Sequence, residues 1–304
     1  MKLHPTDALA QGGRETFREV HLGMEMEVAV VMPSKEQASR VADSAYAHVE
    51  RLEQILSDWR ATSELRRLES YAPKTWIAIS PPLCEVLALA LDVAKHSGGR
   101  FDPSIGPLTA LWREAARTGI PISDSARAEA QRQVDYRAVK LDRRRCRVRF
   151  ERAGMRLDLG AVAKGWILDD ALALVRRSGA RAAMLSAGGD LVAYGYPPSS
   201  GPPRDGDAGW RVLVPRAQGD TVLVITQGAV STSGPSAQRA PAAQGEESHV
   251  FDARLGRGST RAGDVTVMGE RAAVTDALAT AISLLSDKDG QKLARRYRVT
   301  IITR

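Results

Sequence analysis

In residues 24–56 the spacing of apolar residues changes from that of a strand to that of a helix, with almost no break between the two. The segment MEMEVAVVM (residues 24–32) alternates and then runs apolar, which is typical of a strand. Pro33-Ser34 then provides a start for a helix. The apolar residues that follow at helical spacing are Ala38, Val41, Ala42, Ala45, Val49, Leu52 and Ile55. A strand that leads directly into a long helix favours a fold in which helices and a sheet share one core.

The same interleaving of helices and strands continues along the chain. Further helices are predicted at residues 81–99, ending at Gly98-Gly99, and at residues 165–179. Strand pairs are predicted around residues 138–150 and 182–195. Neither an internal repeat nor a change in composition marks a linker. We therefore predict a single α+β domain over residues 1–304, with mixed or antiparallel sheets flanked by helices and a disordered segment at residues 1–16.

The charge of the chain argues against a nucleic-acid binder. Its 43 Lys and Arg outnumber its 36 Asp and Glu, which gives a mild net charge of +7 that is spread along the sequence. The densest basic run, DRRRCRVRF (residues 142–150), contains no interleaved aromatic residues and is typical of a strand edge or a hairpin. A positive field also favours an anionic small molecule or an acidic protein partner.

Neither a disulfide framework nor a metal-binding cysteine pair is predicted. Cys84 and Cys146 are far apart in different local contexts, and Cys84 reads as a small core residue. The sequence also lacks the apolar run of a secretory signal and a segment long enough to span a membrane. We predict a soluble chain, and its compartment stays open.

Three segments that contain glycine could bind a ligand. DLGAVAKG (residues 158–165) follows a strand and opens a helix, where backbone N–H groups and Lys164 can attract an anion. SAGGD (residues 186–190) permits a close backbone approach to a ligand, but a plain tight turn explains it equally well. In SHVFDARLG (residues 248–256), His249 precedes Asp252 by three residues, and a lone histidine is more often structural than catalytic.

The apolar segment VTDALATAIS (residues 274–283) carries Asp276 and Thr280, one helical turn apart. Their oxygens could hold a hard cation. Alternatively, the hydroxyl bonds back to its own helix and the carboxylate lies near a helix start.

Together and in order, these motifs resemble those of the ApbE-type FAD:protein FMN transferases, from about Phe17 to about Leu285. The matching segments are HLGMEMEVAV, ILSDWRATSELRRL, SGGRFDPSIGPLTALW, LDLGAVAKGWILDD, SAGGDLVAYG, GAVSTSG, HVFDARLG and TDALATA. Departures from the family pattern are Met24 in place of threonine, Ser104 in place of threonine and Ala253 in place of proline. The resemblance implies the ApbE-like fold, with FAD in a cleft between two lobes.

The resemblance also implies a set of site residues. Asp276 and Thr280 match the family's Mg²⁺ ligands, completed by a backbone carbonyl that corresponds most closely to that of Ala161. Trp59 matches the aromatic residue beside the flavin ring, although it could instead be a core residue. The other positions that match FAD contacts are Phe101, Asp102, Pro103, Asp158, Lys164 and His249, of which Phe101 and Pro103 could simply shape their loop.

The implied reaction moves the FMN part of FAD to a Ser or Thr hydroxyl of an acceptor protein and releases AMP. His249, or the metal-bound carboxylate Asp276, matches the group that takes the hydroxyl proton. Asp252 could orient His249 or bind a neighbouring backbone N–H. Two other functions stay open, namely an FAD pyrophosphatase and a non-catalytic FAD-binding protein. Members of the family commonly work outside the cytoplasmic membrane, often anchored by lipid.

Overall fold

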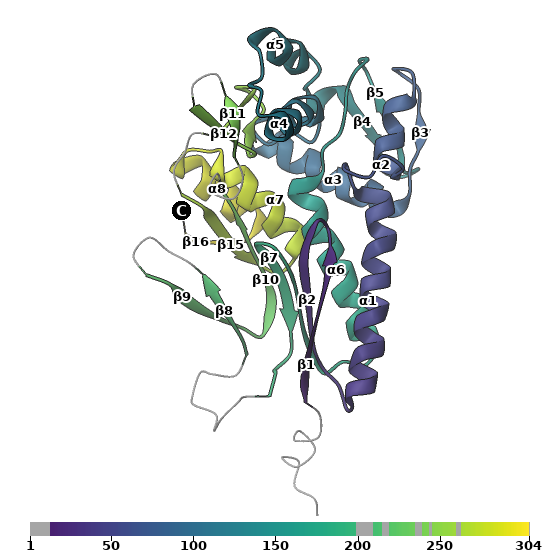
Figure 1. Ribbon diagram of the computed structural model, residues 1–304, viewed down its shortest axis with the longest axis vertical. Helices are drawn as coiled ribbons and strands as arrows, with labels where there is room; N and C mark the ends of the chain where they lie inside the picture. Colours follow the sequence, from purple (N-terminus) through teal and green to yellow (C-terminus); the bar gives the residue numbers. More distant parts are fainter. Residues whose placement is uncertain are drawn as a thin grey trace, which may run out of the picture.

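A seven-stranded sheet runs through the centre of the molecule (Figure 1). The computed structural model describes residues 13–198, 209–214, 219–234, 239–242, 245–259 and 263–303. Every neighbouring pair of strands in this sheet is antiparallel. In spatial order its strands are β1 (Arg14–His21), β2 (Met24–Val31), β6 (Ala182–Ala187), β7 (Asp190–Tyr194), β10 (Gln227–Ser233), β15 (Val265–Gly269) and β16 (Thr300–Thr303).

The two faces of the sheet bury alternate residues of the same strands. On β2, Val28 and Val30 join the large core formed with the helices, whereas Ala29 and Val31 belong to a smaller core. That smaller core is covered by the hairpin β8 (Trp210–Val214) and β9 (Thr221–Ile225). The helices of the large core are α1 (Lys35–Leu56), α3 (Pro81–His96), α6 (Gly160–Arg177), α7 (Ala272–Ser283) and α8 (Asp287–Tyr297). Strands with both faces buried explain the continuous apolar run at the end of β2.

A second group of elements lies beyond one end of the sheet (Figure 1). Its helices are α2 (Glu64–Arg67), α4 (Gly106–Thr118) and α5 (Asp124–Arg132), with 3₁₀ turns at Leu68–Ser70 and Tyr136–Ala138. Its strands are β3 (Ile77–Ala78), β4 (Val139–Asp142), β5 (Arg147–Phe150), β11 (Arg239–Ala242), β12 (Gly245–Ser248), β13 (Phe251–Asp252) and β14 (Arg257–Gly258). Leu108 and Trp112 of α4 pack there with Phe251 in a separate core.

Most of the predicted elements are confirmed, and the differences have local causes. The helix at residues 35–56 begins after Ser34, whose Oγ accepts the Gln37 N–H at 3.3 Å. Helix α6 begins at Gly160, five residues before the predicted start. The hairpin β11–β12 occupies a segment read as a loop, because its many small residues hide any alternation. The prediction of disorder over residues 1–16 is wrong from Arg14 onward, where β1 begins, and residues 1–12 lie outside the described part. Among the described residues, no helix is both long and apolar enough to cross a membrane.

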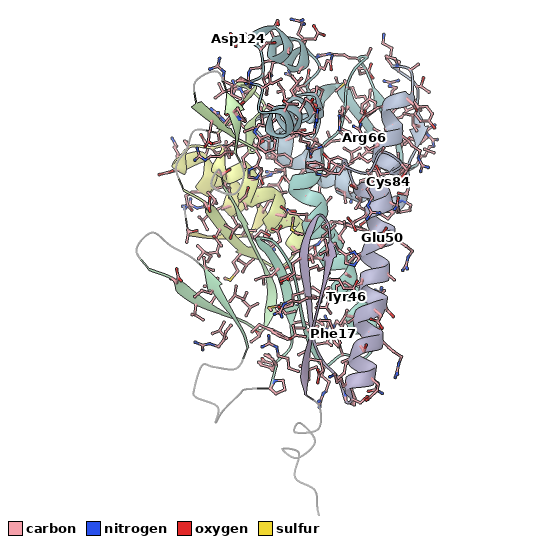
Figure 2. The ribbon with its side chains drawn as sticks, viewed as in Figure 1. Phe17, Tyr46, Glu50, Arg66, Cys84 and Asp124 are labelled. Atoms are coloured by element: carbon pink, nitrogen blue, oxygen red, sulfur yellow. A yellow bond between two sulfur atoms is a disulfide. The ribbon has the colours of Figure 1, made fainter. Side chains whose placement is uncertain are left out.

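The prediction that the two cysteines do not pair is wrong. Cys84 of α3 and Cys146, in the turn before β5, form a disulfide with a Cα–Cα distance of 5.4 Å (Cys84 is labelled in Figure 2). Strand β3 pairs with β5, and the Ile79 N–H donates to the Cys146 carbonyl at 2.9 Å. This pairing brings together two residues that are 62 positions apart, a proximity that sequence spacing cannot reveal.

We expect the disulfide to be a large part of the stability of the domain. Closing a loop of this length lowers the entropy of the unfolded chain, which corresponds to about 4 kcal/mol at 25 °C. Reduction with dithiothreitol is therefore expected to lower the melting temperature by several degrees, measured by circular dichroism. The Cys84→Ala/Cys146→Ala variant is the control, because its melting temperature should not respond to the reductant. Equal melting temperatures for the oxidised and reduced wild-type chain would contradict this expectation.

Candidate active site

Two buried carboxylates and one lysine meet where α6, α7 and β7 come together. Lys164 Nζ lies 2.8 Å from Asp190 Oδ2 and 3.1 Å from Asp276 Oδ1. Asp190 begins β7 after the Gly-Gly turn, and Asp276 lies in the second turn of α7. Both carboxylates are buried. Two negative groups around one cation make this a strongly charged position inside an otherwise apolar region.

Burial and the neighbouring charge of Asp190 raise the pKa of Asp276 to about 7. Burial alone would lower the pKa of Lys164, but the two carboxylates outweigh it and the pKa is raised. Lys164 therefore stays charged, and an additional cation would favour the ionised form of Asp276.

The first turn of α6 departs from regular helix geometry beside Asp276. Ala161 has φ −91° and ψ 16°, which is not helical. The Gly165 N–H, whose partner in a regular helix is the Ala161 carbonyl, donates to Asp276 Oδ2 at 3.0 Å. The non-helical turn at Ala161 therefore lies four residues before the amide that binds the Asp276 carboxylate.

Thr280 lies one turn after Asp276 on α7, and its Oγ1 donates to Ser233 Oγ at 3.0 Å. The alternative of a hydroxyl bonded to its own backbone is therefore not what the structure has. Nor does Asp276 cap its own helix, since its carboxylate bonds to residues of α6. The start of α7 is capped from α6 by Asp169, which accepts the Ala272 and Ala273 N–H groups at 2.8 and 3.0 Å.

Trp59 lies in the loop between α1 and α2, and its side chain is 70% exposed. The alternative that Trp59 is a core residue is wrong. The guanidinium of Arg113, from α4, lies over the indole with its Cζ 4.1 Å from the ring centroid. Both residues line a cavity of about 700 Å³, together with Trp112. An exposed aromatic face beside a cavity is a suitable platform for a flat ring.

Beneath Trp59, Arg113 connects two carboxylates. Its Nη2 contacts Asp58 Oδ2 and lies 3.0 Å from Asp158 Oδ2. Burial and the charge of Asp158 raise the pKa of Asp58 to about 7. Burial alone would also raise the pKa of Asp158, but Arg113 and the Gly160 N–H hold it below its usual value. Below pH 7 the pair therefore keeps a proton, which Asp58 holds in preference to Asp158.

This arrangement predicts a pH-dependent effect of the Asp58→Asn variant. Between pH 4 and 7 the folded chain keeps a proton on Asp58 that the unfolded chain releases, so the unfolding free energy falls as pH rises. An asparagine side chain does not titrate, so the stability of the variant relative to wild type should rise across this window and level off above it. The difference in unfolding free energy between the variant and wild type is expected to change by up to a few kcal/mol across this window, at about 1.4 kcal/mol per pKa unit. Urea unfolding from pH 4 to 8 measures it, and parallel curves would contradict the assignment.

The three residues before α4 that are predicted to contact FAD also make contacts within the protein. Phe101 belongs to the large core. Both oxygens of Asp102 are engaged, since Oδ1 accepts the Ser104 N–H and hydroxyl and Oδ2 accepts the Tyr136 N–H. The Pro103 carbonyl accepts the Asp158 N–H at 2.8 Å. The Pro103 carbonyl thus helps to position Asp158, and direct contact of the three residues with FAD stays a prediction.

His249 lies beside Trp112, with 6.2 Å between the two ring centroids. Asp252 accepts the Arg254 N–H at 3.0 Å and pairs with Arg100. The bond to a neighbouring backbone N–H, which is one of the two roles considered for Asp252, is therefore present. Trp112 lines the cavity that contains Trp59, so the histidine lies next to a cavity wall.

The order of these elements and residues matches a known family. The family model described as the ApbE family matches residues 22–303. The chain belongs to the ApbE family. The resemblance inferred from the ordered motifs is therefore confirmed.

Relatives of this ApbE-family chain include proteins named FAD:protein FMN transferase. The one from Treponema pallidum is 28% identical over 308 residues, covering 94% of this chain and 84% of the relative. The one from Rhodobacter capsulatus is 29% identical over 265 residues, covering 83% of this chain and 48% of the relative. The flavin transferase ApbE from Vibrio cholerae superimposes with a TM-score of 0.83 at 20% identity, covering 96% of this chain and 93% of that one. The apo form of the flavinyl transferase ApbE from Pseudomonas stutzeri superimposes with a TM-score of 0.80 at 22% identity, and the match covers 97% of this chain and 93% of that one. The two structures confirm the predicted fold.

Within this ApbE-family fold, the motifs did not identify three charged residues of the site. Asp190 ends a quoted motif, but the SAGGD turn was read only as a backbone feature. Asp58 and Arg113 gave no signal, because an ion pair between residues 55 positions apart has no period in the sequence.

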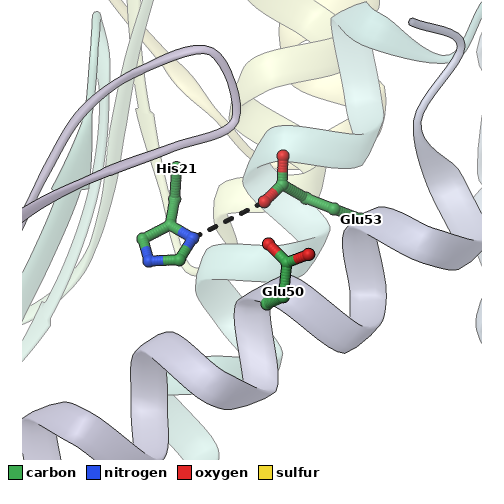
Figure 3. Close-up of side chains that lie close together, drawn as sticks. All are labelled: His21, Glu50 and Glu53. Carbon is green, nitrogen blue, oxygen red and sulfur yellow. Dashed lines mark ion pairs between the residues drawn. The ribbon is translucent and has the colours of Figure 1, made fainter. Parts of the chain in front are cut away.

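A second acidic cluster in this ApbE-family chain, His21, Glu50 and Glu53, lies between the β1–β2 hairpin and α1 (Figure 3). His21 Nδ1 lies 3.6 Å from Glu53 Oε2. Arg60 already binds both Glu50 oxygens at 2.6 and 2.8 Å and Glu53 at 3.3 Å. Because a guanidinium neutralises these carboxylates, the cluster is explained without a metal ion.

Proposed function

We propose that this chain transfers the FMN part of FAD to a Ser or Thr hydroxyl of an acceptor protein and releases AMP, with Mg²⁺ held by Asp276, Thr280 and the Ala161 carbonyl. Transfer of FMN from FAD to a protein is the activity that names its relatives. The observation that carries the metal assignment is the Gly165 N–H bond to Asp276, which brings that carboxylate to the part of α6 that contains the non-helical Ala161.

The donor set fits the ion. A carboxylate, a hydroxyl and a carbonyl are the hard oxygen ligands that Mg²⁺ takes, and three protein ligands leave positions for phosphate and water. The raised pKa of Asp276 also fits, because a buried carboxyl group near another carboxylate favours an added positive charge. When bound, Mg²⁺ would neutralise charge on the phosphate oxygens of the substrate.

The residues of the chain divide the remaining tasks between them. Lys164 lies in the first turns of α6, near N–H groups that favour an anion, and supplies a fixed positive charge for the diphosphate of FAD. The exposed face of Trp59 supplies the surface on which the flavin ring stacks. His249, at the cavity wall beside Trp112, takes the proton of the acceptor hydroxyl.

The role of His249 predicts a specific kinetic defect. His249→Ala is expected to keep FAD binding, because the Trp59 platform and Lys164 are untouched, and to slow transfer roughly 10²- to 10⁴-fold. Stopped-flow flavin fluorescence separates binding from transfer. Trp112→Phe, which keeps an aromatic ring beside His249, is the matched control for packing. Unchanged turnover of the alanine variant would remove His249 from the mechanism.

Mass spectrometry tests the reaction itself. The chain is incubated with FAD, Mg²⁺ and a candidate acceptor domain, and the acceptor is examined for the added mass of FMN through a phosphoester. Free FMN and AMP without an adduct would instead indicate an FAD pyrophosphatase, and bound, intact FAD would indicate a binding protein. Addition of EDTA is the control for the metal.

The disulfide also bears on the cellular compartment of the protein. Disulfides persist mainly outside reducing cytosol, so Cys84–Cys146 supports the location outside the cytoplasmic membrane that the family resemblance implies. Alkylation of free thiols in intact cells tests this location, and fully alkylated cysteines would argue against it.

A further inference from the structure

The indole of Trp59 is in contact with the guanidinium of Arg113. The backbone around it forms a turn in which Ser57 Oγ accepts the Trp59 and Arg60 N–H groups, both at 3.2 Å. That turn fixes the main chain, but a side chain that is 70% exposed keeps its own rotational freedom. The guanidinium, whose Cζ lies 4.1 Å from the ring centroid, covers one face of the indole, and both residues line the cavity.

Arg113 is itself fixed from two directions. Asp58, which precedes Trp59, contacts its Nη2, and Asp158, two residues before α6, lies 3.0 Å from the same nitrogen. Asp158 is held in turn by the Thr109 hydroxyl at 2.7 Å and by the Gly160 N–H at 2.9 Å. The guanidinium thus joins the loop that carries Trp59 to the start of the helix that carries Lys164.

We propose that Arg113 is a positioning residue that fixes the Trp59 indole as the flavin platform and ties it to the start of α6. This inference rests on the proposed function, because it assumes that FAD stacks on Trp59. Fixing the ring before binding removes the entropy that a mobile indole would lose in the complex. A planar guanidinium can stack on an aromatic ring while it bonds to carboxylates at its edge, which an ammonium group cannot do.

A purely structural role for Arg113 makes a different prediction. If Arg113 only neutralises Asp58 and Asp158, its replacement changes stability and affects FAD binding equally with or without the indole. If it acts through Trp59, its replacement affects FAD binding only when the indole is present. A double-mutant cycle separates the two roles.

The experiment measures the dissociation constant of FAD by flavin fluorescence for wild type, Trp59→Ala, Arg113→Lys and the double variant. Arg113→Lys keeps the charge between the two carboxylates, so it protects the fold while it removes the stacked guanidinium. We expect it to weaken FAD binding roughly five- to tenfold in the wild-type background. In the Trp59→Ala background the same change should have less than a twofold effect. Under turnover, the KM for FAD should rise while kcat at saturating FAD stays close to that of wild type.

Asp58→Asn provides a second variant that leaves both Arg113 and Trp59 in place. Above pH 7, where Asp58 is mainly ionised, it removes one of the carboxylates that hold the guanidinium, so we expect a smaller loss of FAD affinity that again disappears without the indole. Equal effects of Arg113→Lys in both backgrounds would overturn the inference while leaving the proposed function intact. A wild-type chain that fails to bind FAD would overturn both.

Discussion

Replacing Asp276 with alanine is expected to abolish Mg²⁺-dependent transfer of FMN, and Asp276→Asn is expected to lower its rate roughly 10³-fold. The asparagine side chain can still accept the Gly165 N–H that Asp276 accepts at 3.0 Å, so it preserves the local fold. It removes the negative charge that the cation needs. The measurement is the transfer rate as a function of Mg²⁺ concentration, with melting temperatures recorded for each variant.

Asp190→Asn is the matched control for this experiment. Asp190 is also buried and also pairs with Lys164, at 2.8 Å, but it is not a proposed metal ligand. The control variant should therefore keep the Mg²⁺ requirement of the wild type, with an apparent affinity for the ion much closer to that of wild type than of Asp276→Asn. Full activity of Asp276→Ala in the presence of EDTA would refute the metal assignment.

The second large effect is expected from Gly165→Ala. A Cβ at this position would lie 2.1 Å from the Ala272 carbonyl oxygen and 2.4 Å from its carbon, so α6 and α7 cannot keep their present separation. We expect a loss of about 3 kcal/mol or more in unfolding free energy. Transfer activity should fall with it, because the same displacement lengthens the Gly165 N–H bond to Asp276.

Gly160→Ala, on the same helix, separates this effect from a general effect of replacing glycine with alanine. Its Cβ would meet only the Asp158 side chain, at 3.2 Å, so a small shift accommodates it. Chemical unfolding and the transfer assay are applied to both variants. If Gly165→Ala were as stable as Gly160→Ala, the close approach of the two helices would have no energetic importance.

The parts of the fold that repeat locally could be predicted from the sequence. The apolar spacing of residues 38–55 gave α1, and the Gly-Gly stop gave the end of α3. Asp276 and Thr280 could be placed on one face of α7, because they are one turn apart in a helix. The ordered motifs then gave the family, and through it the fold.

Contacts between distant residues could not be predicted in this way. The Gly165 N–H of α6 donates to a carboxylate of α7 that lies 111 residues later in the chain. The Cys84–Cys146 disulfide depends on the pairing of β3 with β5. The support of Trp59 by Arg113 depends on two carboxylates from different loops. None of these contacts leaves a period or a spacing in the sequence.

The bonds from α6 to α7 come as two matched sets, one helical turn apart on each helix. Gly165 binds Asp276, and Asp169 binds the amides of Ala272 and Ala273. A shift of α7 along α6 by one residue would break both sets of hydrogen bonds at once. The two sets therefore fix the register between the two helices. If Asp276 and Thr280 hold an ion as proposed, these bonds fix the position of their oxygens as the chain folds, before the ion or a nucleotide binds. Mutations that break the hydrogen bonds of Asp169, away from Asp276 itself, should therefore lower both the affinity for the ion and the free energy of unfolding.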